Sequence, residues 1–126
     1  MENKRVLIIE DDLTLRNVLA EFLGSEGFLV GVASDGEEGI NMIKSYNPDI
    51  VLLDIILPKK NGFEVLKEVR DNEGKLSVPF VLLTNLGSLD DIEKALELGA
   101  TTYLVKGDYQ VREIVEKVKE ILSKEK

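Results

Sequence analysis

Five short runs of branched apolar residues alternate along this chain with five segments of helical spacing. The apolar runs occupy residues 5–9, 28–33, 49–53, 78–83 and 101–105. Most are continuous rather than alternating, which is typical of strands covered on both faces of a parallel sheet. Strands that alternate with helices favour right-handed crossovers. At this chain length, five such units predict an α/β fold with an open, doubly wound parallel sheet rather than a closed barrel.

The segments between the runs repeat apolar residues every three or four positions, as amphipathic helices do. Their apolar residues, in chain order, are Leu15, Val18, Leu19, Phe22 and Leu23, then Ile40, Ile43 and Tyr46, then Val65, Leu66 and Val69, then Ile92, Ala95 and Leu96, and finally Val111, Ile114, Val115, Val118, Ile121 and Leu122. No linker or low-complexity tract interrupts the 126 residues. We therefore expect a single domain over residues 1–126, with no output domain attached.

The composition excludes several kinds of reactive site and two classes of binding partner. The chain has no cysteine and no histidine, which excludes disulfides, thiolate metal sites and any catalytic triad that needs an imidazole. Its net charge of −8 repels nucleic acid and anionic membranes, so we expect neither as a direct partner. The apolar runs are only as long as strands, and the N-terminus lacks the features of a signal peptide, so a cytoplasmic protein is expected.

Polar residues follow the predicted strands at the edge of the sheet where ligands bind. In an open parallel sheet, this edge lies outside the carboxyl ends of the strands. The residues there are Glu10, Asp11 and Asp12, then Asp54, Thr84 and Lys106. Carboxylates held close together need a cation, and a set of oxygen ligands suits Mg²⁺ or Mn²⁺. With an ammonium and a hydroxyl nearby, such a site suits phosphoryl transfer, in which Asp54 is the nucleophile and forms an acyl phosphate.

Each of these residues also has an ordinary structural interpretation. Asp12 or Asp11 suits the N-cap of the helix that follows. Asp54 and Lys106 suit a structural ion pair, and Thr84 suits the end of a strand. What favours a functional site is that four separate strands end in the residue types that one phosphate-and-metal site needs.

Several motifs in the chain resemble those of the receiver domain of two-component response regulators. They are the acidic pair Glu10-Asp11 after VLII, the segment DIILPKKNG at 54–62, LLT at 82–84, GA at 99–100 and YLVK at 103–106. The segment at 54–62 is the most specific, because it is close to the pattern around the family's phosphoacceptor. The likeness covers nearly the whole chain and is to the stand-alone, chemotaxis-regulator-like type. It implies a flavodoxin-like sheet with strand order 2-1-3-4-5.

The resemblance implies a role for each residue that matches a family motif. Asp54 is similar to the phosphorylated aspartate and Lys106 to the invariant lysine. Glu10 and Asp11 are similar to the metal-binding acids, and the backbone carbonyl of Ile56 would be a further ligand to Mg²⁺ or Mn²⁺. Because Glu10 is one methylene longer than the more usual aspartate, we expect it to bind the metal through water.

The resemblance also implies a signalling mechanism. A histidine kinase or a histidine phosphotransfer protein would donate the phosphoryl group, and the receiver would catalyse its own phosphorylation and dephosphorylation rather than act as an enzyme on another substrate. Thr84 would be the switch hydroxyl and Tyr103 the switch aromatic, with a core position as the alternative for Tyr103. The surface over residues 88–98 and 103–122 would then change its binding to an unknown downstream protein. We expect a monomer, and dimerisation on activation stays open.

Several residues around the predicted site depart from the family pattern or bear on the lifetime of the phosphate. Gly107 stands where proline is usual, so we predict a trans Lys106–Gly107 bond, because a cis bond before a non-proline residue costs about 2.5–4 kcal/mol. Asn85 replaces a small residue and would either narrow access to the phosphoacceptor or bond a phosphate oxygen. Ile56 and Leu86 are apolar and would keep water away from the acyl phosphate.

Other functions need residues that this chain lacks or a role without phosphorylation. A phosphatase of the haloacid-dehalogenase type would need a general acid at the position of Ile56. The glycine-rich loops of nucleotide-binding modules are missing from the sequence. The alternative that stays open is a degenerate receiver, which would bind partners without being phosphorylated.

Overall fold

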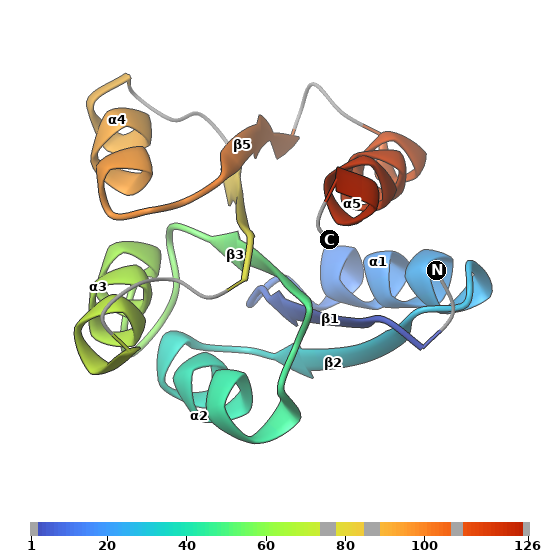
Figure 1. Cartoon of the computed structure of the whole chain (residues 1–126), viewed down its shortest axis with the longest axis horizontal. Helices are drawn as coiled ribbons and strands as arrows, with labels where there is room; N and C mark the ends of the chain where they lie inside the picture. Colours follow the sequence, from blue (N-terminus) through green and yellow to red (C-terminus); the bar gives the residue numbers. More distant parts are fainter. Residues whose placement is uncertain (1–2, 74–77, 85–88, 107–109, 125–126) are drawn as a thin grey trace.

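A regular alternation of strands and helices runs through the part of the chain that the structure describes (Figure 1). The computed structural model describes residues 3–73, 78–84, 89–106 and 110–124. The strands are β1 (Arg5–Ile9), β2 (Leu29–Ala33), β3 (Ile50–Asp54), β4 (Phe80–Thr84) and β5 (Thr102–Val105). The helices are α1 (Leu13–Ser25), α2 (Gly36–Tyr46), α3 (Gly62–Glu73), α4 (Leu89–Glu97) and α5 (Val111–Lys124). The predicted elements are therefore all present, with strand ends shifted slightly, so that Asp54 and Thr84 close β3 and β4 instead of following them.

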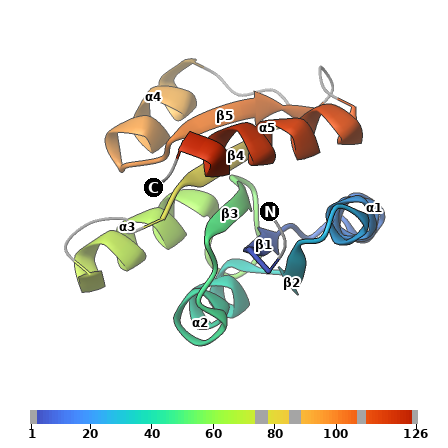
Figure 2. The same ribbon diagram turned by 45° about the vertical axis from the view of Figure 1, so that its right-hand side comes forward.

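All five strands lie in one parallel sheet with the order β2-β1-β3-β4-β5, which confirms the expected flavodoxin-like arrangement. In Figure 2 the strands follow one another from β2 low in the molecule to β5 at the top. The order reverses between β1 and β3, and β2 is an edge strand, as expected. Ile9 lies opposite Leu53, and Asp54 lies opposite Leu83. The carboxyl ends of the three central strands are therefore level, and the residues at these ends lie on one edge of the sheet.

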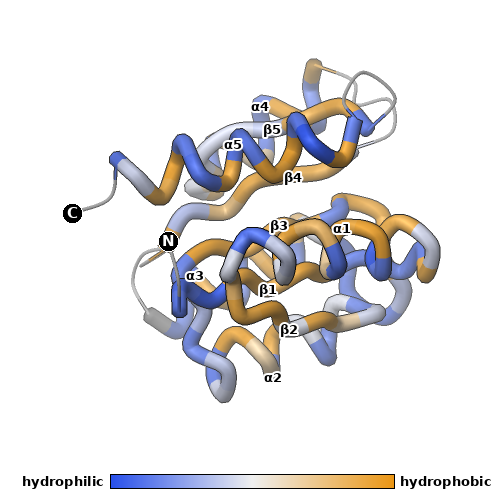
Figure 3. The backbone as a smooth tube through the Cα atoms, turned by 90° about the vertical axis from the view of Figure 1, so that its right-hand side faces the viewer, coloured by the Kyte–Doolittle hydropathy of each residue, from blue (hydrophilic) through white to orange (hydrophobic). Residues whose placement is uncertain are grey.

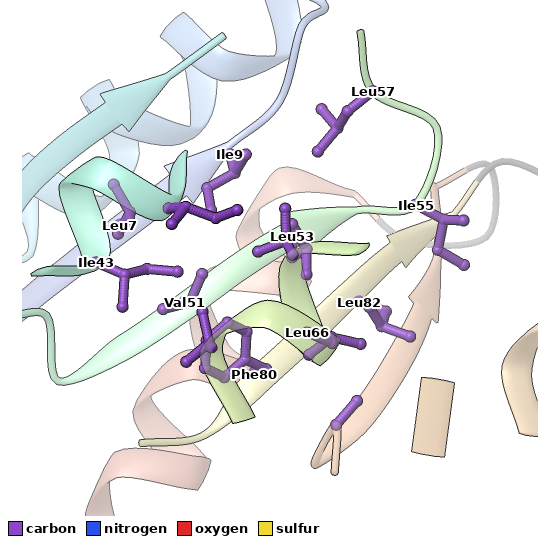
Figure 4. Packing of buried hydrophobic residues seen from close by; sticks show 14 of the residues in the cluster. Leu7, Ile9, Ile43, Val51, Leu53, Ile55, Leu57, Leu66, Phe80 and Leu82 are labelled. Atoms are coloured by element: carbon purple, nitrogen blue, oxygen red, sulfur yellow. The ribbon is translucent and has the colours of Figure 1, made fainter. Parts of the chain in front are cut away.

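Two apolar clusters cover the two faces of this sheet. Successive residues of a strand point to opposite faces, so Leu7 and Ile9 belong to the cluster with α2, α3 and α4, whereas Val6 and Ile8 belong to the cluster with α1 and α5. Figure 4 shows the first cluster, in which Phe80 packs among residues of β3 and α3. All residues of β3 and β4 are buried, and the central strands are mostly orange in Figure 3. Burial on both faces explains why these runs are continuously apolar.

Several aromatic or aliphatic residues lie outside this core, against what their position in an apolar pattern suggests, and Leu29 and Val32 of the edge strand β2 are among them. Phe22 on α1 is 43 % exposed and Leu96 on α4 is 39 % exposed. Tyr103 is 37 % exposed, because β5 is an edge strand and only one of its four residues is buried. The core interpretation of Tyr103 is therefore wrong.

Side-chain hydrogen bonds cap the starts of α2 and α3, the helices before and after β3 in the chain. Asp35 accepts a hydrogen bond from the amide of Glu38 at 2.8 Å, at the start of α2. Asn61 and Glu64 exchange hydrogen bonds between side chain and backbone at 2.9 and 3.0 Å, which forms a capping box at the start of α3. None of the described helices is long and apolar enough to cross a membrane.

Candidate functional site

The carboxyl ends of β1, β3 and β5 surround a small cavity, at the edge where parallel sheets bind ligands. Its volume is about 240 Å³, and it is lined by Glu10, Asp11, Asp12, Asp54, Ile56 and Lys106. These residues come from distant parts of the sequence. The strand order brings them together, because β1 and β3 are neighbours and β5 lies just beyond β4.

Lys106 connects two carboxylates inside this cavity. Its Nζ lies 2.6 Å from Glu10 Oε1 and 3.1 Å from Asp54 Oδ2. The second oxygen of each carboxylate accepts a backbone hydrogen bond, from the Asp12 amide to Glu10 Oε2 at 3.1 Å and from the Ile56 amide to Asp54 Oδ1 at 3.3 Å. The Glu10 side chain is 0 % exposed and those of Asp54 and Lys106 are nearly buried. The predicted ion pair between Asp54 and Lys106 is therefore present, and it is part of a larger polar network.

Burial and neighbouring charged groups together shift the pKa values of Glu10 and Lys106 in this network. Burial raises the pKa of the Glu10 carboxyl above its ordinary value, and the charge of Asp54 adds to this, although Lys106 and the Asp12 amide oppose it. For Lys106, burial by itself would lower the pKa of the ammonium, but Glu10 and Asp54 raise this pKa above its ordinary value. The lysine therefore stays charged at neutral pH, as a fixed positive charge beside Asp54.

The acidic cluster, which consists of Glu10, Asp11 and Asp54, fits a divalent cation. One carboxylate oxygen from each residue lies within 4.8 Å of the other two. Glu10 Oε1 is buried and forms an ion pair with Lys106 Nζ at 2.6 Å, and a carboxylate oxygen has a second lone pair with which to bind a ligand. Three carboxylates beside one lysine leave an excess of negative charge. Oxygen ligands and excess negative charge are what Mg²⁺ and Mn²⁺ prefer, so these side chains fit such an ion.

Asp12 lies in the same cavity but caps α1. Its Oδ1 accepts a hydrogen bond from the amide of Leu15 at 3.2 Å. This confirms the capping interpretation for Asp12, whereas Asp11 is exposed beside the cap and belongs to the acidic cluster. The two adjacent acids thus have different roles, because only Asp12 accepts a hydrogen bond from an amide of α1, whereas Asp11 belongs to the acidic cluster.

Replacement of Asp12 by alanine is expected to lower the free energy of unfolding by about 1 kcal/mol, because alanine cannot accept the hydrogen bond from Leu15. Asp12→Asn is expected to keep nearly all of the stability, because asparagine caps helices about as well as aspartate. Urea unfolding followed by circular dichroism measures both variants. An equal loss in the two would mean that the charge of Asp12, rather than its cap, stabilises the fold.

Thr84 and Ile56 lie at the same edge of the sheet. Thr84 is 5 % exposed and ends β4, next to Leu83, which pairs with Asp54 across the sheet. The Ile56 side chain is 76 % exposed at the mouth of the cavity, and its backbone turns toward Asp54. The structure thus brings both residues near Asp54, while their roles in catalysis and metal binding stay predictions.

Three of the sequence predictions concern residues outside the part of the chain that the structure describes. They are the effect of Asn85 on the phosphoacceptor, the shielding of the acyl phosphate by Leu86, and the trans bond between Lys106 and Gly107. All three stay predictions.

Arg16 makes a contact near the site that the sequence did not reveal. Its Nη1 donates a hydrogen bond to the backbone carbonyl of Glu10 at 3.2 Å. This bond ties α1 to the residue that begins the loop after β1. An arginine on an amphipathic helix ordinarily keeps its charged head in water, so no sequence pattern distinguishes this one.

The sequence matches a known family model over most of its length. Residues 6–119 match the response regulator receiver domain. The chain belongs to this family. The resemblance identified from the sequence motifs is thereby confirmed, and the receiver domain can be compared with its relatives.

Among curated proteins, the receiver domain is most usefully compared with two transcriptional regulators. It is 38 % identical over 119 residues to the probable transcriptional regulator ycf27 of Guillardia theta, which covers 94 % of this chain and 45 % of that protein. It is 40 % identical over 118 residues to the transcriptional regulatory protein CpxR of Escherichia coli (strain K12), which covers 94 % of this chain and 49 % of that protein. The chain therefore spans about half the length of the curated relatives it matches.

Solved structures share the fold of the receiver domain over nearly their whole length. A CheY-like response regulator receiver domain protein from Methanospirillum hungatei JF-1 superposes with a TM-score of 0.88 at 30 % identity, over 97 % of this chain and 95 % of that chain. The BeF3-activated N-terminal receiver domain of RstA from Klebsiella pneumoniae gives 0.82 at 32 % identity, over 94 % and 98 %. These similarities agree with the strand order described above.

Proposed function

We propose that this receiver domain is a phosphoacceptor switch that accepts a phosphoryl group on Asp54. The donor is a histidine kinase or a histidine phosphotransfer protein, and Mg²⁺ binds at the acidic cluster and the backbone carbonyl of Ile56. The observation that carries the proposal is the nearly buried Asp54 carboxylate, held 3.1 Å from the Lys106 ammonium in a cavity that opens at the carboxyl edge of the sheet. A carboxylate that lies beside a fixed positive charge and lines an open cavity is a competent nucleophile.

Asp54, Lys106 and Thr84 have separate roles in the proposed transfer. A carboxylate oxygen of Asp54 attacks the phosphorus, and the bond from phosphorus to the imidazole nitrogen of the donor breaks as the new oxygen–phosphorus bond forms. The imidazole leaves with the electron pair of the broken bond. Lys106 faces the phosphoryl oxygens with a fixed positive charge, and the Thr84 hydroxyl donates a hydrogen bond to them. When bound, the cation neutralises negative charge on the phosphoryl group in transfer.

The proposed output is a change of binding at the surface formed by α4, β5 and α5. Tyr103 supports this proposal, because it lies half-exposed on β5 at a surface hollow of about 490 Å³. Arg112 and Lys117 of α5 line the same hollow. A change in the position of Thr84, at the end of the adjacent strand β4, reaches this surface through its pairing with Val105.

Phosphorylation by acetyl phosphate in the presence of Mg²⁺ tests the proposed function. The unchanged chain is expected to gain the mass of one phosphoryl group, and Asp54→Asn is expected to gain none, because the amide is not a nucleophile. Intact-protein mass spectrometry measures both. Asp71→Asn is the matched control, since it makes the same change on the exposed face of α3 and is expected to keep the full mass gain.

The same experiment distinguishes the alternative function. A chain that neither gains mass nor binds Mg²⁺ in a calorimetric titration would be a degenerate receiver that acts through protein binding alone. A mass gain that persists in Asp54→Asn would place the phosphoacceptor on another residue.

A further inference from the structure

We infer that the start of α2 is a positioning element for the loop that carries Ile56 to the site. This loop, the β3–α3 loop, consists of residues 55–61 and connects β3 to α3. The inference rests on the proposed Mg²⁺-dependent function, because it explains how the chain holds the backbone of one proposed ligand. Its basis is a set of contacts on both sides of the loop.

On its inner side, the β3–α3 loop is anchored in the core. Ile55 and Leu57 belong to the apolar cluster (Figure 4). Their exposures are 7 % and 9 %, whereas Ile56 between them is 76 % exposed. The amide of Gly62 donates a hydrogen bond to the carbonyl of Ile55 at 2.7 Å, which closes the base of the loop. The backbone at Ile56 is thus held between two buried neighbours, with its amide toward Asp54.

On its outer side, the β3–α3 loop lies directly against the first residues of α2. The Gly36 amide donates a hydrogen bond to the carbonyl of Pro58 at 3.3 Å, and Lys59 forms an ion pair with Asp35 at 3.7 Å. A Cβ atom on Gly36 would lie 1.8 Å from the carbonyl oxygen of Lys60. No side chain fits in this gap, so only glycine lets the helix and the loop approach so closely.

The turn at Lys59 shows that the loop is held in this shape from outside. Lys59 has a φ of 67°, in the left-handed region that is unfavourable for lysine. The Lys60 amide donates a hydrogen bond to the Pro58 carbonyl at 2.8 Å across this residue. Such strained turns persist where surrounding contacts determine them, and the contacts with Asp35 and Gly36 flank this turn on the side of α2. The path of the loop from Pro58 back to Ile56 therefore depends on α2.

Gly36→Ala tests this positioning role through the affinity of the full chain for Mg²⁺, measured by isothermal titration calorimetry. The new methyl group pushes the β3–α3 loop away from α2, so the dissociation constant is expected to rise roughly 10-fold, as for other residues that orient metal ligands. The amide resonance of Ile56 in a nitrogen-15 NMR spectrum is expected to shift. Gly24→Ala is the matched control, because a Cβ there meets nothing within 4 Å, and it is expected to bind Mg²⁺ as the unchanged chain does.

A second control separates positioning from a general loss of stability. Val118→Ala removes buried methyl groups of α5, on the opposite face of the sheet, and is expected to destabilise the fold without changing Mg²⁺ affinity or the Ile56 resonance. Equal Mg²⁺ affinity in Gly36→Ala and the unchanged chain would overturn the inference, and so would equal weakening in Val118→Ala. No Mg²⁺ binding by the unchanged chain would instead overturn the proposed function, and the inference with it.

If Gly36→Ala does not fold, Lys59→Gly decides the question. Glycine keeps the left-handed turn but removes the ion pair with Asp35 and loosens the loop. Weaker Mg²⁺ binding than in the unchanged chain is expected, and unchanged binding would overturn the inference.

Discussion

Replacement of Lys106 by methionine is expected to lower the free energy of unfolding by about 3 kcal/mol in the absence of divalent cations. The ammonium is the ionic partner of Glu10 at 2.6 Å and of Asp54 at 3.1 Å, and the Glu10 side chain is fully buried. Methionine has nearly the same length but no charge, so it leaves two carboxylates close together without a cation between them. Urea unfolding measures the loss.

Mg²⁺ is expected to restore much of this stability, because it supplies the missing positive charge at the acidic cluster. The variant is also expected to bind Mg²⁺ more tightly than the unchanged chain, since Lys106 competes for the same carboxylate oxygens. Phosphorylation by acetyl phosphate is expected to slow, because the phosphoryl oxygens lose a fixed positive charge.

The control for Lys106→Met is Lys67→Met, which removes an exposed lysine of α3 and is expected to change stability by less than about 0.5 kcal/mol. If Lys106→Met unfolds like this control, with and without Mg²⁺, then the buried ion pair contributes nothing to the fold. Tighter Mg²⁺ binding in Lys67→Met would show that only the net charge matters.

Gly62→Ala is expected to destabilise the fold by about 2–3 kcal/mol and to slow phosphorylation of Asp54. A Cβ on Gly62 would lie 2.7 Å from the backbone oxygen of Asp54 and 2.8 Å from the Cα of Ile55. Both neighbours are backbone atoms at the end of β3, which cannot rotate away as a side chain can. The substitution therefore displaces the segment that carries the phosphoacceptor. Urea unfolding and the rate of mass gain with acetyl phosphate measure the two effects.

The same change at Gly24 is expected to act in the opposite direction. Nothing lies within 4 Å of a Cβ there, and the residue is in the last turns of α1. Alanine is the better helix former, so a gain of up to about 1 kcal/mol is expected. A destabilised Gly24→Ala, or a Gly62→Ala as stable and as reactive as the unchanged chain, would contradict this explanation.

Several residues of the site could be predicted from the sequence, because the apolar runs show where the strands end. Continuous apolar runs identify strands buried on both faces, and a parallel sheet gathers their carboxyl ends on one edge. Glu10, Asp54 and Thr84 could therefore be assigned to one site from the sequence. Asp12 also follows a local rule, since an acid just before an amphipathic segment is a typical helix cap.

Other features depend on which segments meet in space, and the sequence carries no sign of them. In the sequence, Tyr103 lies in an apolar run, which favours a core position. In the structure it is half-exposed, because β5 is an edge strand. The bond from Arg16 to the carbonyl of Glu10 depends on how α1 packs against the sheet. Neither could be deduced from local spacing, because exposure and partner choice are set by neighbours far away in the sequence.

By itself, the sequence determined the fold class and the chemistry available at the edge of the sheet, because periodicity and residue type act locally. The tertiary structure alone decided the geometry of the charges: Lys106 lies between Glu10 and Asp54 because the carboxyl ends of β5, β1 and β3 lie on one edge of the sheet and line the same cavity. It also decided that Gly36 meets the β3–α3 loop at a distance that no side chain permits. A contact of this kind is a property of two packed backbones, and no local pattern in the sequence encodes it.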